Sequence, residues 1–161
     1  MSYEQYVNYP SIDASEFHDF EEHDRNIGFF ASFENEALNI IEGEKITAPE
    51  EYKGEVFTQA LNRTKIYVAG LSTSVEKMLG AMACGCLLIT NNDTVLKEMG
   101  YVDNIHYSFY TTSQDLKEQV EFFLQRESRR KRMVTARNGQ YFTTENHTDL
   151  KREETKNSNT I

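Results

Sequence analysis

The stretch STSVEKMLGAMACGCLLIT, residues 72–90, decides the fold of this chain. Its first part places apolar side chains at the helical spacing i, i+3, i+4, i+7 and i+8, at Val75, Met78, Leu79, Met82 and Ala83. The run CLLIT that follows is apolar on both alternating sets, as in a parallel strand covered on both faces. The stretch therefore predicts a helix, a tight turn and a central parallel strand.

The rest of the chain alternates expected strands with expected helices. We expect strands over residues 27–33, 45–48, 66–69, 86–90 and 105–110. We expect helices over residues 34–42, 50–65, 94–99, from a cap at 111–113, and over 126–137, with a break and a resumption within 138–148. Because no hairpin dipeptides join the strands, this order predicts an α/β fold with an open, mainly parallel sheet and helices on both faces.

Length and composition limit the class of protein. The 161 residues fit one domain, which we place at residues 26–150, after an acidic extension (1–25) and before a polar tail (151–161). The net charge of −9 argues against a nucleic-acid partner. No apolar run is long enough to span a membrane, and the first residues lack the order of a secretory signal, so we expect a cytoplasmic protein. Cys84 and Cys86 suit reduced thiols that act as small apolar residues.

The helix in the opening stretch has an unusual second face, made of Lys77, Gly80, Ala81 and Cys84. A glycine inside a helix costs about 1 kcal/mol relative to alanine, so close approach of another group would explain Gly80. Thr73 and Glu76 have the spacing of a capping box. A helix N-terminus with Lys77 beside it favours a phosphate-bearing ligand, while a closely packed helix with a solvated Lys77 is the alternative. The glycine spacing is not a P-loop, because Cys86 and Leu87 replace its Lys and Ser or Thr.

Two longer runs resemble a known family. KIYVAGLSTSVEKMLGAMACGCLLITNNDTVLKEM (65–99), with its AMACG core, resembles group 1 glycosyltransferases, especially the spore-coat glycosyltransferase-like branch. SQDLKEQVEFFLQRESRRKRMVTARNGQYFTTENHT (113–148) looks like the closing helices of that family. The resemblance covers roughly residues 27–150. It implies the Rossmann-like, C-terminal half of a GT-B enzyme, the half that holds the nucleotide-sugar donor.

The same resemblance implies the binding residues. Gly70, Ser72, Thr73 and Ser74 form the loop and cap near the donor phosphates, and Lys77 stands at the basic position. Gly80 stands where the family has a glutamate that accepts hydrogen bonds from the ribose hydroxyls. Loss of that acceptor would cost on the order of 1.5 to 3 kcal/mol of binding. No catalytic residue is identified, and no metal or resident cofactor is expected beside the nucleotide-diphosphate sugar.

Two functions remain open, with a third reached by fold alone. The first is a glycosyltransferase-like donor-binding half that transfers, or formerly transferred, a sugar to an unknown acceptor. Because only the acidic extension precedes Ile27, it would need a separate acceptor-binding protein, or another copy of itself. The second is a catalytically inactive Rossmann-like interaction module. A flavodoxin-like receiver is the third, and Phe33-Glu34 fits it poorly.

Other titratable groups suggest weaker hypotheses. His18, Asp19, Glu21, Glu22, His23 and Asp24 could hold a metal, but a solvated acidic segment explains them as well. We expect His106 on a strand, and His147 in a packing or capping role. The basic cluster comprises Arg126, Arg129, Arg130, Lys131, Arg132 and Arg137. It could hold a phosphate, bind the acidic segment of another copy, or form a solvated helix face.

Overall fold

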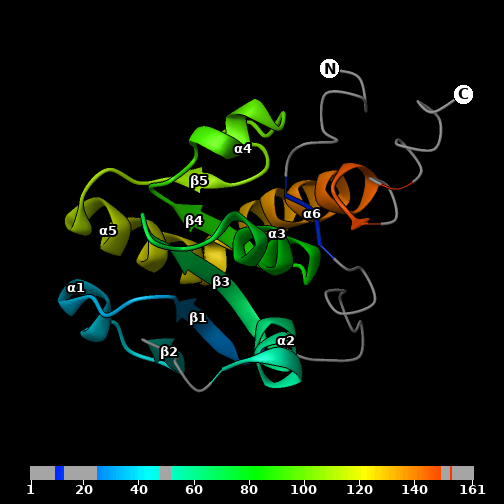
Figure 1. The fold of residues 1–161 in the computed structure, drawn as a ribbon. Helices are drawn as coiled ribbons and strands as arrows, with labels where there is room; N and C mark the ends of the chain where they lie inside the picture. Colours follow the sequence, from blue (N-terminus) through cyan, green and yellow to red (C-terminus); the bar gives the residue numbers. More distant parts are fainter. Residues whose placement is uncertain (1–9, 13–24, 48–51, 150–152, 154–161) are drawn as a thin grey trace, which may run out of the picture.

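The computed structural model describes residues 10–12, 25–47, 52–149 and 153. Five strands form one sheet in the order β2-β1-β3-β4-β5, and every neighbouring pair is parallel. Their bounds are β1 Ile27–Ala31, β2 Lys45–Thr47, β3 Thr64–Ala69, β4 Leu87–Thr90 and β5 Ser108–Phe109. Figure 1 shows the strands side by side with helices around them. This is the expected α/β, Rossmann-like arrangement.

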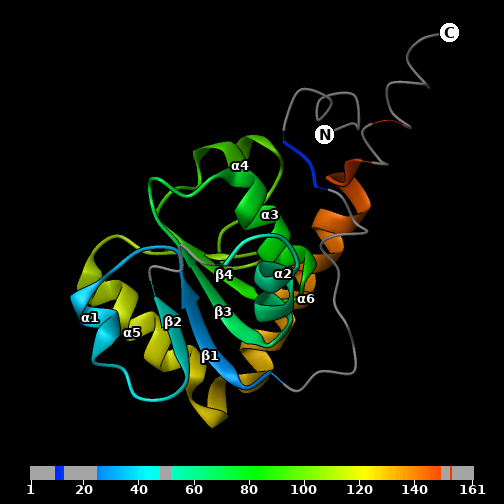
Figure 2. The same cartoon turned by 60° about the horizontal axis from the view of Figure 1, so that its bottom comes forward.

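Helices connect the strands and close the chain. Their bounds are α1 Glu36–Asn39, α2 Gly54–Asn62, α3 Val75–Ala83, α4 Thr94–Glu98, α5 Ser113–Leu124 and α6 Arg129–Asn146, with a 3-10 turn, η2, at Arg126–Ser128. Figure 2 shows α1 and α5 on one side of the sheet and α2 and α3 on the other. Among the described helices, none combines the length and the apolar character that crossing a membrane requires.

Alternation along the strands divides the core into two layers. Phe30 and Tyr67 point into one layer, together with the apolar sides of α2 and α3. Phe29 and Ile66 point into the other, with α1 and α5. All four residues of β4 are buried, as the run CLLIT predicts. The long helix α6 reaches both layers, because Ala136 lies in the second and Phe142 packs against the first.

Tertiary contacts correct three sequence-based boundaries. The helix expected over 50–65 is α2, which ends at Asn62 because Thr64 already belongs to β3. The strand expected over 105–110 shrinks to Ser108–Phe109. The break expected within 138–148 does not occur, since α6 runs unbroken to Asn146.

Gly139 explains why α6 passes close to its neighbours without a break. A Cβ atom built on Gly139 would lie 2.5 Å from the carbonyl oxygen of His106 and 3.2 Å from Met82 Sδ. Only a residue without a side chain allows this approach. The glycine in NGQYF therefore marks a close contact between α6 and both α3 and the turn before β5.

The ends of the chain are described only in part. Ile12, from the expected extension, is 3% exposed and forms a parallel bridge with Thr148. The N–H of Ile12 donates to the His147 carbonyl at 3.0 Å, and the N–H of Asp149 donates to the Ile12 carbonyl at 2.6 Å. The possible metal ligands of residues 18–24 and the polar tail after Glu153 lie outside the described residues.

Candidate functional site

The loop between β3 and α3 lies at the carboxyl edge of the sheet and is held by its own polar groups. Thr73 Oγ1 accepts a hydrogen bond from the Gly70 N–H at 2.9 Å, and the Thr73 N–H donates to the Gly70 carbonyl at 3.1 Å. Ser74 is the N-cap of α3, where its Oγ accepts from the Lys77 N–H at 3.3 Å. The capping box expected at Thr73 and Glu76 is therefore wrong. The N-cap is Ser74, Lys77 rather than a glutamate stands three residues further on, and Thr73, which is 8% exposed, closes the loop instead.

Ser32 joins this loop to the end of β1. Its hydroxyl shares a hydrogen bond of 2.6 Å with Thr73 Oγ1, and it donates to the Val68 carbonyl at 3.2 Å. β1 and β3 are neighbours from which the chain winds in opposite directions across the sheet. Ligands of open α/β sheets bind outside the carboxyl ends of the strands at such a switch point. Ser32 and the loop 70–74 thus lie where this fold places a ligand.

The predicted site residues differ in exposure. Ser72, Ser74 and Lys77 are exposed, whereas Gly70 and Thr73 are buried. A Cβ atom on Gly70 would lie 3.1 Å from the Phe33 ring, so this position favours glycine. Gly80 is buried within α3, and no carboxylate occupies its position. The structure brings Gly70, Thr73 and Ser74 together, with Lys77 on the first turn after them.

A buried oxygen without a partner lies near this loop. Asn91 follows β4, and its side-chain Oδ1 accepts no hydrogen bond from any group in the described structure. The neighbouring Asn92 donates from Nδ2 to the Leu71 carbonyl at 3.3 Å, which connects the loop after β4 to the loop after β3. An unsatisfied buried acceptor costs about 1–3 kcal/mol, so a donor group from a ligand would stabilise it.

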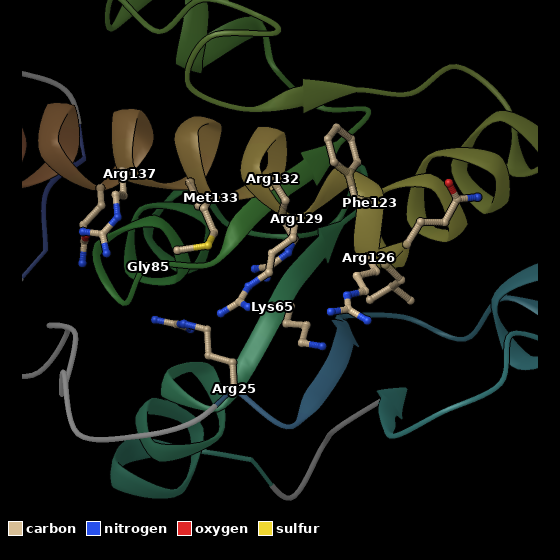
Figure 3. A pocket seen from close by; sticks show the side chains of 13 residues that line it. Arg25, Lys65, Gly85, Phe123, Arg126, Arg129, Arg132, Met133 and Arg137 are labelled. Atoms are coloured by element: carbon tan, nitrogen blue, oxygen red, sulfur yellow. The ribbon is translucent and has the colours of Figure 1, made fainter.

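The opposite, amino edge of the sheet carries a different feature, a cavity of about 870 Å³. Figure 3 shows basic side chains converging on it from the segment before β1, from β3, and from η2 and α6. They are Arg25, Lys65, Arg126, Arg129, Arg132 and Arg137. None of the six residues predicted for donor binding lines this cavity. The solvated helix face expected for the basic cluster is wrong only for Arg132, which is buried; the other members are exposed, namely Arg126, Arg129, Arg130, Lys131 and Arg137.

Buried tyrosines near the carboxyl edge do not supply a base. The Tyr107 hydroxyl donates to Asp93 Oδ2 at 2.7 Å, and burial, followed by the effect of Asp93, raises the pKa of Tyr107. Burial raises the pKa of Tyr110 to about 12. Both phenols stay protonated near neutral pH, so they act as hydrogen-bond donors.

The remaining candidates have structural roles. His106 lies in the turn before β5, where its Nδ1 accepts from the Val102 N–H at 2.9 Å, so the expected strand position is wrong. His147 is fully buried, stacks on Tyr101 and lies 3.2 Å from the Met99 carbonyl oxygen, which confirms packing. Cys84 and Cys86 are buried, and the Cys86 thiol donates to the Leu61 carbonyl at 3.1 Å. Within the described part of the chain, no cluster of His, Cys, Asp or Glu could hold a metal ion.

Sequence reasoning missed two functional residues and found the cavity only in part. Ser32 and Asn91 carried no signal for a site, because a serine or asparagine after a strand is ordinary loop composition. The cavity did leave a signal, since its residues on α6 repeat at helical spacing: Arg129, Arg132, Met133, Ala136, Arg137 and Gln140. Lys65 and Arg25 reach the same place only through the fold.

The parallel sheet and the polar loop at its switch point define the class, a Rossmann-like α/β domain with a polar loop before α3. Residues 17–155 match the model of a family described as glycosyl transferase-like. Because the match spans most of the sequence, the chain belongs to this glycosyl transferase-like family. No curated protein matches the chain.

Proposed function

We propose that this domain is the donor-binding half of a group 1 glycosyltransferase with the GT-B architecture, in the spore-coat glycosyltransferase-like branch. It binds a nucleotide-diphosphate sugar at the carboxyl edge of the sheet and works with a separate acceptor-binding protein or with a second copy. The observation that carries the proposal is the loop 70–74, tied to β1 by the hydrogen bond between Ser32 and Thr73.

The electrostatics of the loop suit the diphosphate of such a donor. α3 begins at Val75 directly after the loop, so its first free N–H groups face the same edge and favour an anion. The exposed ammonium of Lys77 adds a mobile positive charge. The Ser72 and Ser74 hydroxyls are exposed beside it and can donate to phosphate oxygens.

The orphan oxygen of Asn91 supports a ligand with hydrogen-bond donors. Sugar hydroxyls and a base N–H are donors of this kind, and Asn91 lies at the end of β4, next to β3 in the sheet. A donor group there would remove the cost of the unpaired acceptor.

One observation favours a second function, that of an inactive interaction module. Gly80 is buried and brings no carboxylate to the helix at the position where the family resemblance implies an acceptor for the ribose. On this alternative, the domain keeps the fold, binds no nucleotide sugar and acts through a defined protein partner.

Isothermal titration with UDP, GDP and their sugars separates the two functions. If the domain is the donor-binding half, the nucleotides bind, and Lys77→Ala lowers their affinity about three- to tenfold, as expected for the loss of one exposed charge. Lys131→Ala is the matched control, because Lys131 is an exposed lysine on α6 that packs over Phe122 and should leave affinity unchanged. Absence of binding at millimolar nucleotide would favour the interaction module instead.

A further inference from the structure

The cavity at the amino edge is far from the loop 70–74. Lys65, which lines the cavity, is the second residue of β3, and Gly70 follows the last residue of the same strand. Five strand residues span about 16 Å, so the two places lie at opposite edges of the sheet. A ligand at one edge does not occupy the other.

Three separate segments bring positive charge to this cavity (Figure 3). Arg25 is fixed at its place because its Nη1 donates to the carbonyls of Leu61 and Thr64 at 3.0 and 2.6 Å, and its Nη2 donates to that of Cys84. Lys65 reaches the cavity from β3, and four arginines come from η2 and α6. Among the described residues that line the cavity, none is acidic.

Arg132 shows the electrostatic consequence. The residue is only 6% exposed, and its guanidinium makes no hydrogen bond or ion pair with any described residue. Burial lowers the pKa of Arg132, and the neighbouring charges of Arg25 and Arg129 lower it further. A buried cation among cations is unfavourable unless an anion joins it.

The dipole of α6 adds to the positive potential in the cavity. α6 begins at Arg129 and has 18 residues, and its N-cap, Ser128, makes no side-chain cap hydrogen bond. Cations at a helix N-terminus are unfavourable, because that end already carries a partial positive charge. The Arg129 N–H already donates to the Arg126 carbonyl within η2, so an anion there would be stabilised by the helix dipole and by the arginines.

We propose that this cavity binds an oligophosphate, a small molecule with at least two linked phosphate groups. Lys65 and the four arginines of η2 and α6 carry more positive charge than one carboxylate or one phosphate can neutralise, and guanidinium groups match phosphate oxygens in paired hydrogen bonds. The cavity volume of about 870 Å³ lies within the range of small-molecule sites. Phe123, Met133 and Ala136 add an apolar wall that an organic group on the phosphate chain could contact.

A neighbouring hollow offers the control. It has a volume of about 460 Å³, shares Arg126, Arg129 and Arg137 with the cavity, and is also lined by Glu127 and Arg130. Arg130 is exposed and does not line the larger cavity. Arg130→Gln therefore removes the same charge from the same helix without touching the proposed site.

Calorimetric titration of the full chain with pyrophosphate, tripolyphosphate and ADP tests the proposal. We expect tripolyphosphate to bind. Arg129→Gln and Arg132→Met should each lower the affinity for tripolyphosphate about ten- to a hundredfold, because each variant loses a hydrogen-bonded charge contact with the phosphate chain. Arg130→Gln should change affinity less than twofold. If ADP binds more tightly than pyrophosphate, and this binding is lost in Arg129→Gln but kept in Lys77→Ala, the ligand of the cavity is organic. If pyrophosphate binds more tightly than ADP, the ligand is inorganic.

Three results would overturn the proposal. One is the absence of binding at millimolar tripolyphosphate, and another is an equal loss in Arg130→Gln and Arg129→Gln. The third is that tripolyphosphate binds only after Glu21, Glu22 and Asp24 are changed to their amides. Carboxylates of the chain itself, and not an oligophosphate, would then neutralise the cavity. Lys77→Ala should leave tripolyphosphate affinity unchanged, so failure here is distinguishable from failure at the donor loop.

Discussion

The two edges of the sheet differ in the charge of the side chains that they bring together. At the carboxyl edge, Ser32, Gly70 and Thr73 satisfy one another within a neutral loop, and Lys77 stands as a single exposed charge beside it. At the amino edge, six cations line one cavity and Arg132 is buried among them. The first edge is ordered before any ligand binds. The second brings like charges together around Arg132, and this is why we propose an anionic ligand there.

Reversing one charge at each edge gives the largest expected effect. Arg129→Glu should lower the affinity for tripolyphosphate at least about a hundredfold, because the change removes a cation and adds a carboxylate that repels the phosphates. Lys77→Glu should weaken UDP-sugar binding and leave tripolyphosphate unchanged. Calorimetric titration of both variants with both ligands measures this. If each variant weakened both ligands equally, the edges would not be separate sites.

Gly139→Ala tests how far the amino edge depends on the close packing of α6. The new methyl group would meet the His106 carbonyl oxygen, so we expect a loss of about 1–3 kcal/mol in the free energy of unfolding, despite the better helix propensity of alanine. Urea denaturation measures the loss. Val134→Ala, on the exposed side of α6, is the control and should change stability by less than about 0.5 kcal/mol. An unchanged or raised stability in Gly139→Ala would contradict the close contact.

Thr73→Val tests the internal order of the carboxyl edge. Valine keeps the shape of threonine but leaves the Gly70 N–H without its acceptor, which should cost about 1–2 kcal/mol in the free energy of unfolding. Ser72→Ala removes an exposed hydroxyl in the same loop and should cost less than about 0.5 kcal/mol. Equal effects of the two changes would mean that the loop is not held by Thr73.

His106 should give the smallest effect, a change of stability with pH. Burial lowers the pKa of His106 in the folded state, and its Nδ1 must be unprotonated to accept from the Val102 N–H. The unfolded chain, with a histidine pKa of about 6.5, then binds more protons than the folded chain. Stability should therefore fall as the pH is lowered through about 6.5. Urea midpoints between pH 7.5 and 5 measure this slope, and His106→Asn should make it shallower; an unchanged slope would contradict this role.

Most of the fold could be predicted from sequence because its patterns are local. The stripe of α3 and the doubly buried run of β4 follow from side-chain periodicity alone, and both are observed. The boundaries that failed depend on distant partners. Thr64 joins β3 because it lies beside Ile27 in the sheet, and α6 continues through Gly139 because His106 and Met82 lie against it.

The candidate sites were predictable to different degrees. The loop 70–74 could be found because a small polar loop between a strand and a helix has a local signature. Its ties to Ser32 could not, because a hydrogen bond between residues 41 apart depends on the pairing of β1 with β3. The arginines of α6 have a visible helical spacing, but Lys65 and Arg25 come to the same cavity only when the strands are aligned.

The sequence by itself determined the alternation of strands and helices, the parallel sheet and the resemblance that the glycosyl transferase-like family match supports. These depend on side-chain periodicity and on short motifs, which act over a few residues. Only the tertiary structure decided that Thr73 closes a loop rather than capping a helix, and that Arg132 is buried among like charges. Burial and electrostatic repulsion depend on which distant residues the fold brings together, and no local pattern encodes that.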